Sequence, residues 1–254
     1  MKNMPREGSG RPRTTLDLLW GTGDGGTRGP RPTLSPEKIV QAAVEVADAD
    51  GLGALSMQKV ADRLGFTTMS LYRHVPGKEP LIELMIDRAV GTPPELSAHP
   101  DWRTMVEAWI EALWNRYQQH PWMLHVQAGP PLGPNQLSWL ESLLTALADT
   151  GLTDDERFVI SLYLNGATLG IARLVSDAEQ VTADRGVPAE QLSTDYSEAM
   201  GRLIDSDRFP VLTSLVRSGA LNAPASATGR AAPDYEFGLR RLMDGVEAYV
   251  AERT

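Results

Sequence analysis

The sequence predicts an all-α fold in which a small helix-turn-helix domain, residues 34–92, precedes a larger helical domain, residues 93–254. Two observations lead to this prediction. From residue 34 onward the apolar residues recur at the three- and four-residue spacings of amphipathic helices, and no segment alternates as a half-buried strand does. The helical segments also become longer after Gly91-Thr92-Pro93-Pro94, a stretch typical of a joint between domains.

Length and composition agree with a folded chain. It has 254 residues, of which 42% are hydrophobic and 22% charged, enough to bury a core. The absence of cysteine excludes disulfides and thiolate zinc sites. No uninterrupted apolar run reaches the roughly 18 residues of a membrane span, and no signal-peptide core follows the basic N-terminus. We therefore expect a cytoplasmic protein that has no membrane partner.

The net charge of −9 is unevenly distributed along the chain. Residues 1–33 carry a formal charge of +3, residues 34–92 carry −2 and residues 93–254 carry −10. Within residues 56–78 the sign reverses, because Lys59, Arg63, Arg73 and Lys78 outnumber Asp62. This local excess of cations is suited to a phosphate backbone.

Residues 1–33 are rich in Gly, Pro, Arg and Thr and show no sustained period, so we expect a flexible basic arm. A short apolar cluster, from Leu16 to Trp20, interrupts it. The run from Gly21 to Gly26 matches the dinucleotide-binding pattern Gly-x-Gly-x-x-Gly, but no strand precedes it. We interpret the match as accidental.

The first long helix is expected directly after the arm. Ser35 is a suitable N-cap, Pro36 suits the first helical position, and Leu34 with Ile39 can form a hydrophobic staple. Gly51 stands where the helix should end, because a glycine adopts the left-handed conformation needed there.

Three short helices follow. The first is capped by Ser56 and ended by Gly65, the second spans about Thr68 to His74, and the third runs over residues 78–90. A glycine turn between two short helices is typical of a helix-turn-helix unit. Beyond it, helices are expected at about 101–119, 121–127, 134–150, 153–178, 188–205, 207–218 and 234–252, with a flexible loop over 220–233.

The stretch from Leu55 to Lys78 reads LSMQKVADRLGFTTMSLYRHVPGK. It combines a capping Ser, an Ala on its first helix, a Gly turn, a Leu-Tyr-x-His helix end and a Lys that opens the next helix. In this combination it resembles the DNA-binding domain of the tetracycline-repressor (TetR) family. The resemblance implies a dimeric regulator of transcription, by default a repressor, that binds double-stranded operator DNA and responds to a small hydrophobic effector.

The residue types suit DNA recognition independently of the resemblance. A helix that reads the major groove needs small polar residues at its start, and Thr67, Thr68 and Ser70 are of this kind. Lys78 adds its charge to the free N–H groups at a helix start, a favourable anion site. The full set of DNA-contact candidates is Ser56, Gln58, Thr67, Thr68, Met69, Ser70, Tyr72, His74 and Lys78.

Some of these candidates come from the resemblance, and some have a structural alternative. The resemblance implies a base contact for Gln58 and phosphate contacts for Tyr72 and His74. Ser56 is alternatively a helix cap alone, Met69 a packing residue, and Tyr72 a largely buried side chain. Arg28 and Arg31 in the arm either enter an adjacent minor groove or make no contact.

Two later helices are suited to close helix–helix contact. Residues 153–178 are apolar on nearly all sides and carry Gly166 and Gly170, while residues 234–252 align Gly238 and Gly245 on one stripe. The last helix also resembles the terminal dimerisation helix of the tetracycline-repressor subgroup. We expect these two helices to pair with those of a second copy in a four-helix bundle. The alternative is that both are core helices of a monomer.

The middle of the chain holds most of the aromatic residues, and the resemblance implies an effector cavity there. Amphipathic rings and flexible thioethers suit a bulky apolar ligand, although an ordinary core has the same composition. The candidate ligand residues are Trp102, Met105, Trp109, Trp122, His125, Trp139 and Tyr163.

No metal or cofactor is expected. Leu124-His125-Val126 resembles the segment that supplies a metal-binding histidine in tetracycline repressors, but Leu174 stands where the acidic partner is expected. His125 is therefore interpreted as a structural or hydrogen-bonding residue. An enzyme is not expected either, since the sequence has no nucleophile elbow, zinc-protease motif or phosphate loop. A helical protein-binding adaptor is the alternative function.

Overall fold

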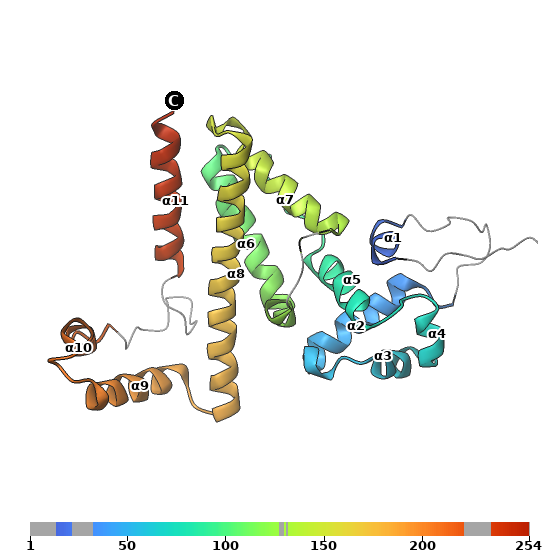
Figure 1. Ribbon diagram of the computed structural model, residues 1–254, viewed down its shortest axis with the longest axis horizontal. Coiled ribbons are helices and arrows are strands. Elements are labelled where there is room, and N and C mark those ends of the chain that lie inside the picture. Colours follow the sequence, from blue (N-terminus) through green and yellow to red (C-terminus); the bar gives the residue numbers. More distant parts are fainter. Residues whose placement is uncertain (1–13, 22–32, 127–129, 131, 221–234, 254) are drawn as a thin grey trace, which may run out of the picture. The chain divides into compact units, whose positions relative to one another are not determined.

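The computed structural model describes residues 14–21, 33–126, 130, 132–220 and 235–253, and within them it contains helices and no strand (Figure 1). The expected all-α fold is confirmed. The elements are α1 (Thr15–Trp20), α2 (Pro36–Asp50), η1 (Leu52–Ala54), α3 (Met57–Leu64), α4 (Thr68–Tyr72), α5 (Lys78–Val90), α6 (Trp102–Gln119), η2 (Pro121–His125), α7 (Pro134–Ala146), η3 (Ala148–Thr150), α8 (Asp154–Arg185), α9 (Ala189–Leu203), α10 (Pro210–Arg217) and α11 (Tyr235–Ala251).

The chain forms two compact units. One comprises Met1–Leu96 and Asn115–Thr145, and the other comprises Ser97–Trp114 and Ala146–Thr254. Helix α6 is continuous from the second unit into the first. The segment Asn115–Thr145, which the sequence analysis assigns to the second domain, thus groups with the helix-turn-helix.

Helix α2 is the centre of the first unit, because α3, α5 and η1 all pack against it. Its predicted start is confirmed, since the Ser35 hydroxyl accepts a hydrogen bond from the Lys38 N–H at 3.4 Å. Ile39 and Ala43 are fully buried on its inner face. Gly51 ends the helix with a positive φ of 78°, which an L-residue adopts only at a cost.

Residues Thr15–Trp20 form a short helix, α1, where the sequence analysis expects a flexible arm. Thr14 and Asp17 cap it reciprocally, and the helix packs on α5. The Trp20 indole N–H also donates to the Leu132 carbonyl at 2.9 Å. A six-residue helix is marginal alone, so packing on α5 stabilises it. The rest of the arm, the glycine run after Thr22 and the loop over residues 221–234 lie outside the described residues.

The N-terminus of α7 is capped by a carboxylate from α5. Asp87 is only 5% exposed, and its Oδ1 accepts from the Gln136 N–H while its Oδ2 accepts from the Asn135 side-chain amide, both at 3.0 Å. Burial raises the pKa of Asp87, and the hydrogen bonds from Gln136 and Asn135 oppose that effect. Gly133 leaves room for this contact, because a Cβ there would lie 2.0 Å from Asp87 Oδ1.

The second unit is organised around α8, with α11 beside it and α9 leading away from its C-terminal end (Figure 1). Helix α8 ends seven residues beyond the predicted helix, at Arg185 before Gly186. At its start, Tyr249 of α11 donates its hydroxyl to Glu156 at 2.7 Å. This hydrogen bond is the main reason why the pKa of Glu156 is lowered to about 2. The contact joins the end of α11 to the start of α8.

Helix α11 is also tied to α6 by charged groups. The Arg103 guanidinium bonds Asp244 at 2.7 Å and also pairs with Glu247 and, on its own helix, with Glu107. These carboxylates raise the pKa of Arg103, with Asp244 the largest contributor. Together with Glu156, the network fixes α11 within the second unit.

Helix α8 corrects the expectation that no segment could cross a membrane. It has 32 residues, and its most apolar 18-residue window has a mean hydropathy of 1.5 with 28% of the window buried. The search for an uninterrupted apolar run missed it because isolated polar residues divide the helix. Core helices of soluble proteins can be equally long and apolar. Whether protein or lipid covers α8 therefore decides between the two interpretations.

Replacing Gly133 with Ala should destabilise the first unit. The new methyl group would overlap Asp87 Oδ1 and Cβ, both of which lie under 3 Å from it, so the cap on α7 must shift. We expect a loss of about 1–3 kcal/mol in the free energy of unfolding, measured by urea denaturation. The matched variant Gly53→Ala, where no atom lies within 4 Å of the new methyl, should stay within about 0.5 kcal/mol of wild type. Equal stability of the two variants would contradict the role of Gly133.

Candidate functional site

The short helix α4 presents the predicted reading residues on its outer side. Met69 is 67% exposed, so the alternative that it only packs is wrong. Thr67 is the N-cap: its hydroxyl accepts from the Ser70 N–H at 3.3 Å and lies 3.0 Å from the Ser70 hydroxyl. The start of α4 is thus a small, ordered and polar surface.

Buried residues at its C-terminal end hold α4 in place. Leu71 and Val75 have no exposed surface, and their backbone N–H groups both bond back toward the start of the helix, to Thr67 and Leu71. Gly65 makes the turn from α3 in the left-handed conformation, at φ 72° and ψ 30°. A side chain with a Cβ is strained there, which explains the glycine that the sequence analysis identified.

Helix α3 supplies two further candidates, and both are engaged within the chain. Ser56 caps the helix by accepting from the Lys59 N–H at 3.1 Å, and it is also exposed. The Gln58 amide donates to Asp62 at 2.6 Å. A base contact by Gln58 therefore requires its amide to leave Asp62 or to use its free oxygen.

The end of α4 and the start of α5 form a cationic rim that is partly exposed. Tyr72 is 47% exposed, so the alternative of a largely buried tyrosine is wrong. Lys78 is the first residue of α5, and the N-cap Gly77 offers no side chain to the N–H groups there. His74 lies between them and is half-buried. Anions are favoured at such a helix start.

Only part of the predicted cationic surface is free. Lys59 pairs with Asp50 at 2.8 Å and Arg63 pairs with Glu45 at 2.7 Å, which neutralises both cations. Among the described residues, Arg73 and Lys78 form no ion pair within 4.0 Å. Arg73 is exposed beside Tyr72, and the sequence analysis left it out of the contact candidates. Its position inside the Leu-Tyr-x-His motif, as the variable residue, was the signal available in the sequence.

The seven predicted ligand residues do not form one cluster within a unit. Trp102, Met105, Trp109 and Tyr163 belong to the second unit, and Trp122, His125 and Trp139 to the first. The three tryptophans at 109, 122 and 139 are buried, Trp102 and Met105 are half-buried, and His125 and Tyr163 are exposed.

Two of the predicted ligand tryptophans make hydrogen bonds to the helix-turn-helix part of the first unit. The Trp122 indole N–H donates to Asp48 of α2 at 2.7 Å. The Trp139 indole N–H donates to the carbonyl of Gly91, which follows α5, at 2.9 Å. These rings therefore connect residues 115–145 with α2 and α5.

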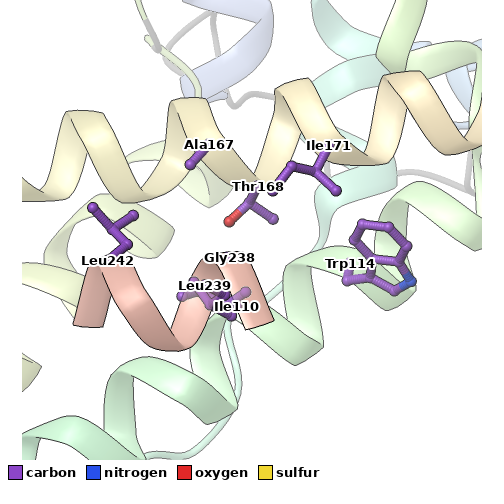
Figure 2. A pocket seen from close by; sticks show the side chains of 8 residues that line it. All are labelled: Ile110, Trp114, Ala167, Thr168, Ile171, Gly238, Leu239 and Leu242. Carbon is purple, nitrogen blue, oxygen red and sulfur yellow. The ribbon is translucent and has the colours of Figure 1, made fainter. Parts of the chain in front are cut away.

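An apolar cavity of about 40 Å³ lies in the second unit, between α6, α8 and α11. Figure 2 shows the side chains that surround it, which come from all three helices. None of the seven predicted ligand residues lines it. The lining residues are Ile110, Trp114, Ala167, Thr168, Ile171, Gly238, Leu239 and Leu242. Trp114 belongs to the aromatic middle of the chain where the cavity is expected, whereas Gly238 was assigned to dimer contact.

The outer sides of α8 and α11 are apolar and open. On α8, Tyr163 is 71% and Leu174 66% exposed, and both flank Gly166 and Gly170. A Cβ at either glycine would meet no atom within 4 Å, and the same holds for Gly238 and Gly245 on α11. Among the residues that the structure describes, nothing makes the expected close approach at these glycines, and Gly238 also borders the cavity.

Comparison with known proteins gives the site its context. Residues 39–85 match the family model "Bacterial regulatory proteins, tetR family", and residues 94–250 match "Tetracyclin repressor-like, C-terminal domain". The chain is 38% identical to the HTH-type transcriptional repressor DrrR1 of Streptomyces coeruleorubidus, over 97% of this chain and 89% of that protein. It is 21% identical to the class A tetracycline repressor of Escherichia coli, over 84% of this chain and 90% of the repressor.

Solved structures agree in fold. ActR of Streptomyces coelicolor in complex with actinorhodin superposes with a TM-score of 0.70 at 26% identity, covering 89% of this chain and all of ActR. Apo ActR gives a TM-score of 0.68 at 24% identity, over 89% of this chain and 100% of that one. Both family models, the full-length relative and these structures lead to one conclusion: the chain belongs to the TetR family of transcriptional regulators, which are DNA-binding proteins and not enzymes.

Proposed function

We propose that the protein is a homodimeric repressor that binds a palindromic operator through α4 and is released by a small hydrophobic effector. The observation that carries the proposal is the pairing of an exposed polar reading surface with unpaired cations beside it. Met69 of this surface is exposed and Thr68 and Ser70 are half-buried, while Arg73 and Lys78 supply cations that form no ion pair with another described residue.

The chemistry of each side chain indicates whether it would contact bases or phosphates. Hydroxyls on the first turn of α4 suit base edges in the major groove, and the thioether of Met69 suits a thymine methyl group. Tyr72, Arg73, His74 and Lys78 suit phosphates, which fix orientation and supply most of the affinity. Ser56, Gln58 and Thr67 complete the proposed contact set from the edges of α3 and α4.

Dimerisation through α8 and α11 explains the open apolar faces. Large contiguous apolar surfaces are rare on monomers, and glycines that border them let a second backbone approach closely. A second copy would cover the exposed apolar surface of α8, so no membrane is needed to cover it. We accordingly place the protein in the cytoplasm. Two copies also give two α4 helices, as a palindrome requires.

The seven sequence-predicted ligand residues are the proposed effector contacts, and the walls of the α6–α8–α11 cavity in the second unit are a further candidate surface. ActR, 26% identical to this chain, has been solved with actinorhodin and with (S)-DNPA. At about 40 Å³ the cavity is far below the roughly 300–1,000 Å³ of ordinary ligand pockets. An effector would therefore favour a wider conformation, and a shift of population toward it would lower operator affinity.

Lys78→Ala and Tyr72→Phe should each weaken operator binding without changing dimerisation. Each removes one hydrogen bond to a charged phosphate, worth about 1.5–3 kcal/mol, so the affinity should fall at least about tenfold. Lys78→Ala should also reduce the salt slope by about one, whereas Tyr72→Phe should leave it unchanged. Fluorescence anisotropy titrations at several salt concentrations measure both quantities. Arg88→Ala, which removes a cation at the opposite end of α5, is the control; wild-type affinity in both test variants defeats the assignment.

Gly166→Leu should disrupt the dimer while each chain stays folded. The new side chain meets open space within one chain but would occupy the space that a partner backbone needs. We expect sedimentation at the 27.7 kDa monomer mass, with the helical circular dichroism of wild type. A variant that still sediments as a dimer would show that α8 does not form the interface.

Actinorhodin is the first effector probe to use, because a relative binds it. A ligand at a hundred times its Kd stabilises a protein by about 2.7 kcal/mol, which a melting scan detects readily. We expect actinorhodin to raise the melting temperature and to release operator DNA at the same concentrations. Stabilisation without release of DNA would show that actinorhodin binds but does not regulate. The absence of both effects would exclude this chemical class as the effector.

A further inference from the structure

The helix-turn-helix, residues 36–90, is attached to residues 115–145 through two carboxylates that make no contribution to the reading surface. Asp48 lies in the last turn of α2, and Asp87 lies in the last turn of α5. Both accept hydrogen bonds from residues of the same compact unit that follow α6 in the chain.

Asp48 holds the segment η2. Its Oδ1 accepts from the Trp122 indole N–H at 2.7 Å and lies 2.8 Å from His120 Nδ1. The two rings meet edge to face, with centroids 6.2 Å apart, and both nitrogen atoms lie within hydrogen-bond distance of the same Asp48 oxygen. The Asp48 side chain is 31% exposed, and the attachment therefore lies at the rim of the core.

Asp87 holds the start of α7, and this attachment differs from the one at Asp48 in its burial and in its number of hydrogen bonds. Its carboxylate accepts from Gln136 and Asn135, its backbone carbonyl accepts a further hydrogen bond from the Asn135 amide at 3.0 Å, and Gly133 closes over it. Trp139 adds the nearby bond to Gly91. This attachment is buried and has several bonds, so it is the stronger of the two.

Two separate attachments constrain more than one does. Asp87 and the neighbouring Gly91 hold the helix-turn-helix at the end of α5, and the bond at Asp48 adds a second point at the end of α2. Helix α4 packs on α3, and α3 packs on α2, so the direction of α4 follows that of α2. Asp48 therefore controls the orientation of α4 without touching it.

We propose that Asp48 and Asp87 are positioning residues that set the half-site spacing the dimer accepts, with Asp87 as the fixed attachment and Asp48 as the one that can be released. This inference rests on the proposed function, since spacing has meaning only for a dimer on a palindrome. Trp122 links the two proposals, because it belongs to the predicted ligand residues and its N–H is bound to Asp48.

The test is an operator-spacing series. An operator is first selected from a random duplex library with the wild-type dimer, and its half-sites are then moved one or two base pairs closer or farther apart. Binding to each duplex is measured for wild type, Asp48→Ala and Trp122→Phe, the last of which keeps a ring and removes only the donor. We expect the preference of wild type for its best spacing over its neighbours to fall at least threefold in both variants.

Two further variants separate positioning from general effects. Asp48→Asn keeps an acceptor oxygen for Trp122 and should recover most of the preference. Asp50→Ala removes the same charge from the same helix end, but its partner Lys59 lies within the helix-turn-helix, so the spacing profile should keep the wild-type shape. A change in overall affinity that scales all spacings equally does not count as positioning.

The outcomes distinguish the two proposals. If wild type selects no duplex, the proposed function fails and the inference fails with it. If wild type shows a sharp spacing preference and Asp48→Ala and Trp122→Phe keep it while only their melting temperatures fall, Asp48 is merely structural and the positioning role is overturned.

Discussion

The packing of Leu71 and Val75 supports the whole reading surface, because α4 has only five residues and a helix of that length is not stable by itself in water. Each fully buried aliphatic side chain contributes about 1.5–3 kcal/mol, and these two lie at the C-terminal end of α4. That leaves the first turn free to present hydroxyls, with Thr67 ordering it as cap. The exposed position of Met69 and Tyr72 is a consequence of the same geometry.

The second constraint is how the helix-turn-helix is joined to the rest of the chain. Asp48 and Asp87 fasten it to residues 115–145, and helix α6 continues from those residues into the second unit without a break. A change in an effector site reaches DNA only through elements that respond together, and both attachments lie within the unit that carries α4. Polar contacts of this kind are suited to the task, because they can be broken singly while the apolar core stays intact.

Several helix bounds could be predicted from local sequence, and so could the exposure of Met69 and Tyr72 that the DNA-contact proposal requires. Ser35, Ser56, Gly51 and Gly65 carry their capping roles in their own chemistry, so α2 and α3 begin and end where expected. Tertiary contacts could not be predicted. The sequence does not show that Lys59 and Arg63 are neutralised by Asp50 and Glu45, that Gly133 accommodates Asp87, or that α1 packs on α5. The same holds for the cavity walls, since Ala167 and Thr168 have no signal that distinguishes them from other helix residues.

The central claim is that two copies of α4 enter the major groove of one palindrome, and protection of guanine N7 from methylation by dimethyl sulfate tests it most directly. This atom lies only in the major groove. The account predicts two protected stretches about one helical turn apart, equally occupied and lost together in the Gly166→Leu monomer. A single protected stretch, or tight binding that leaves every N7 reactive, would contradict it.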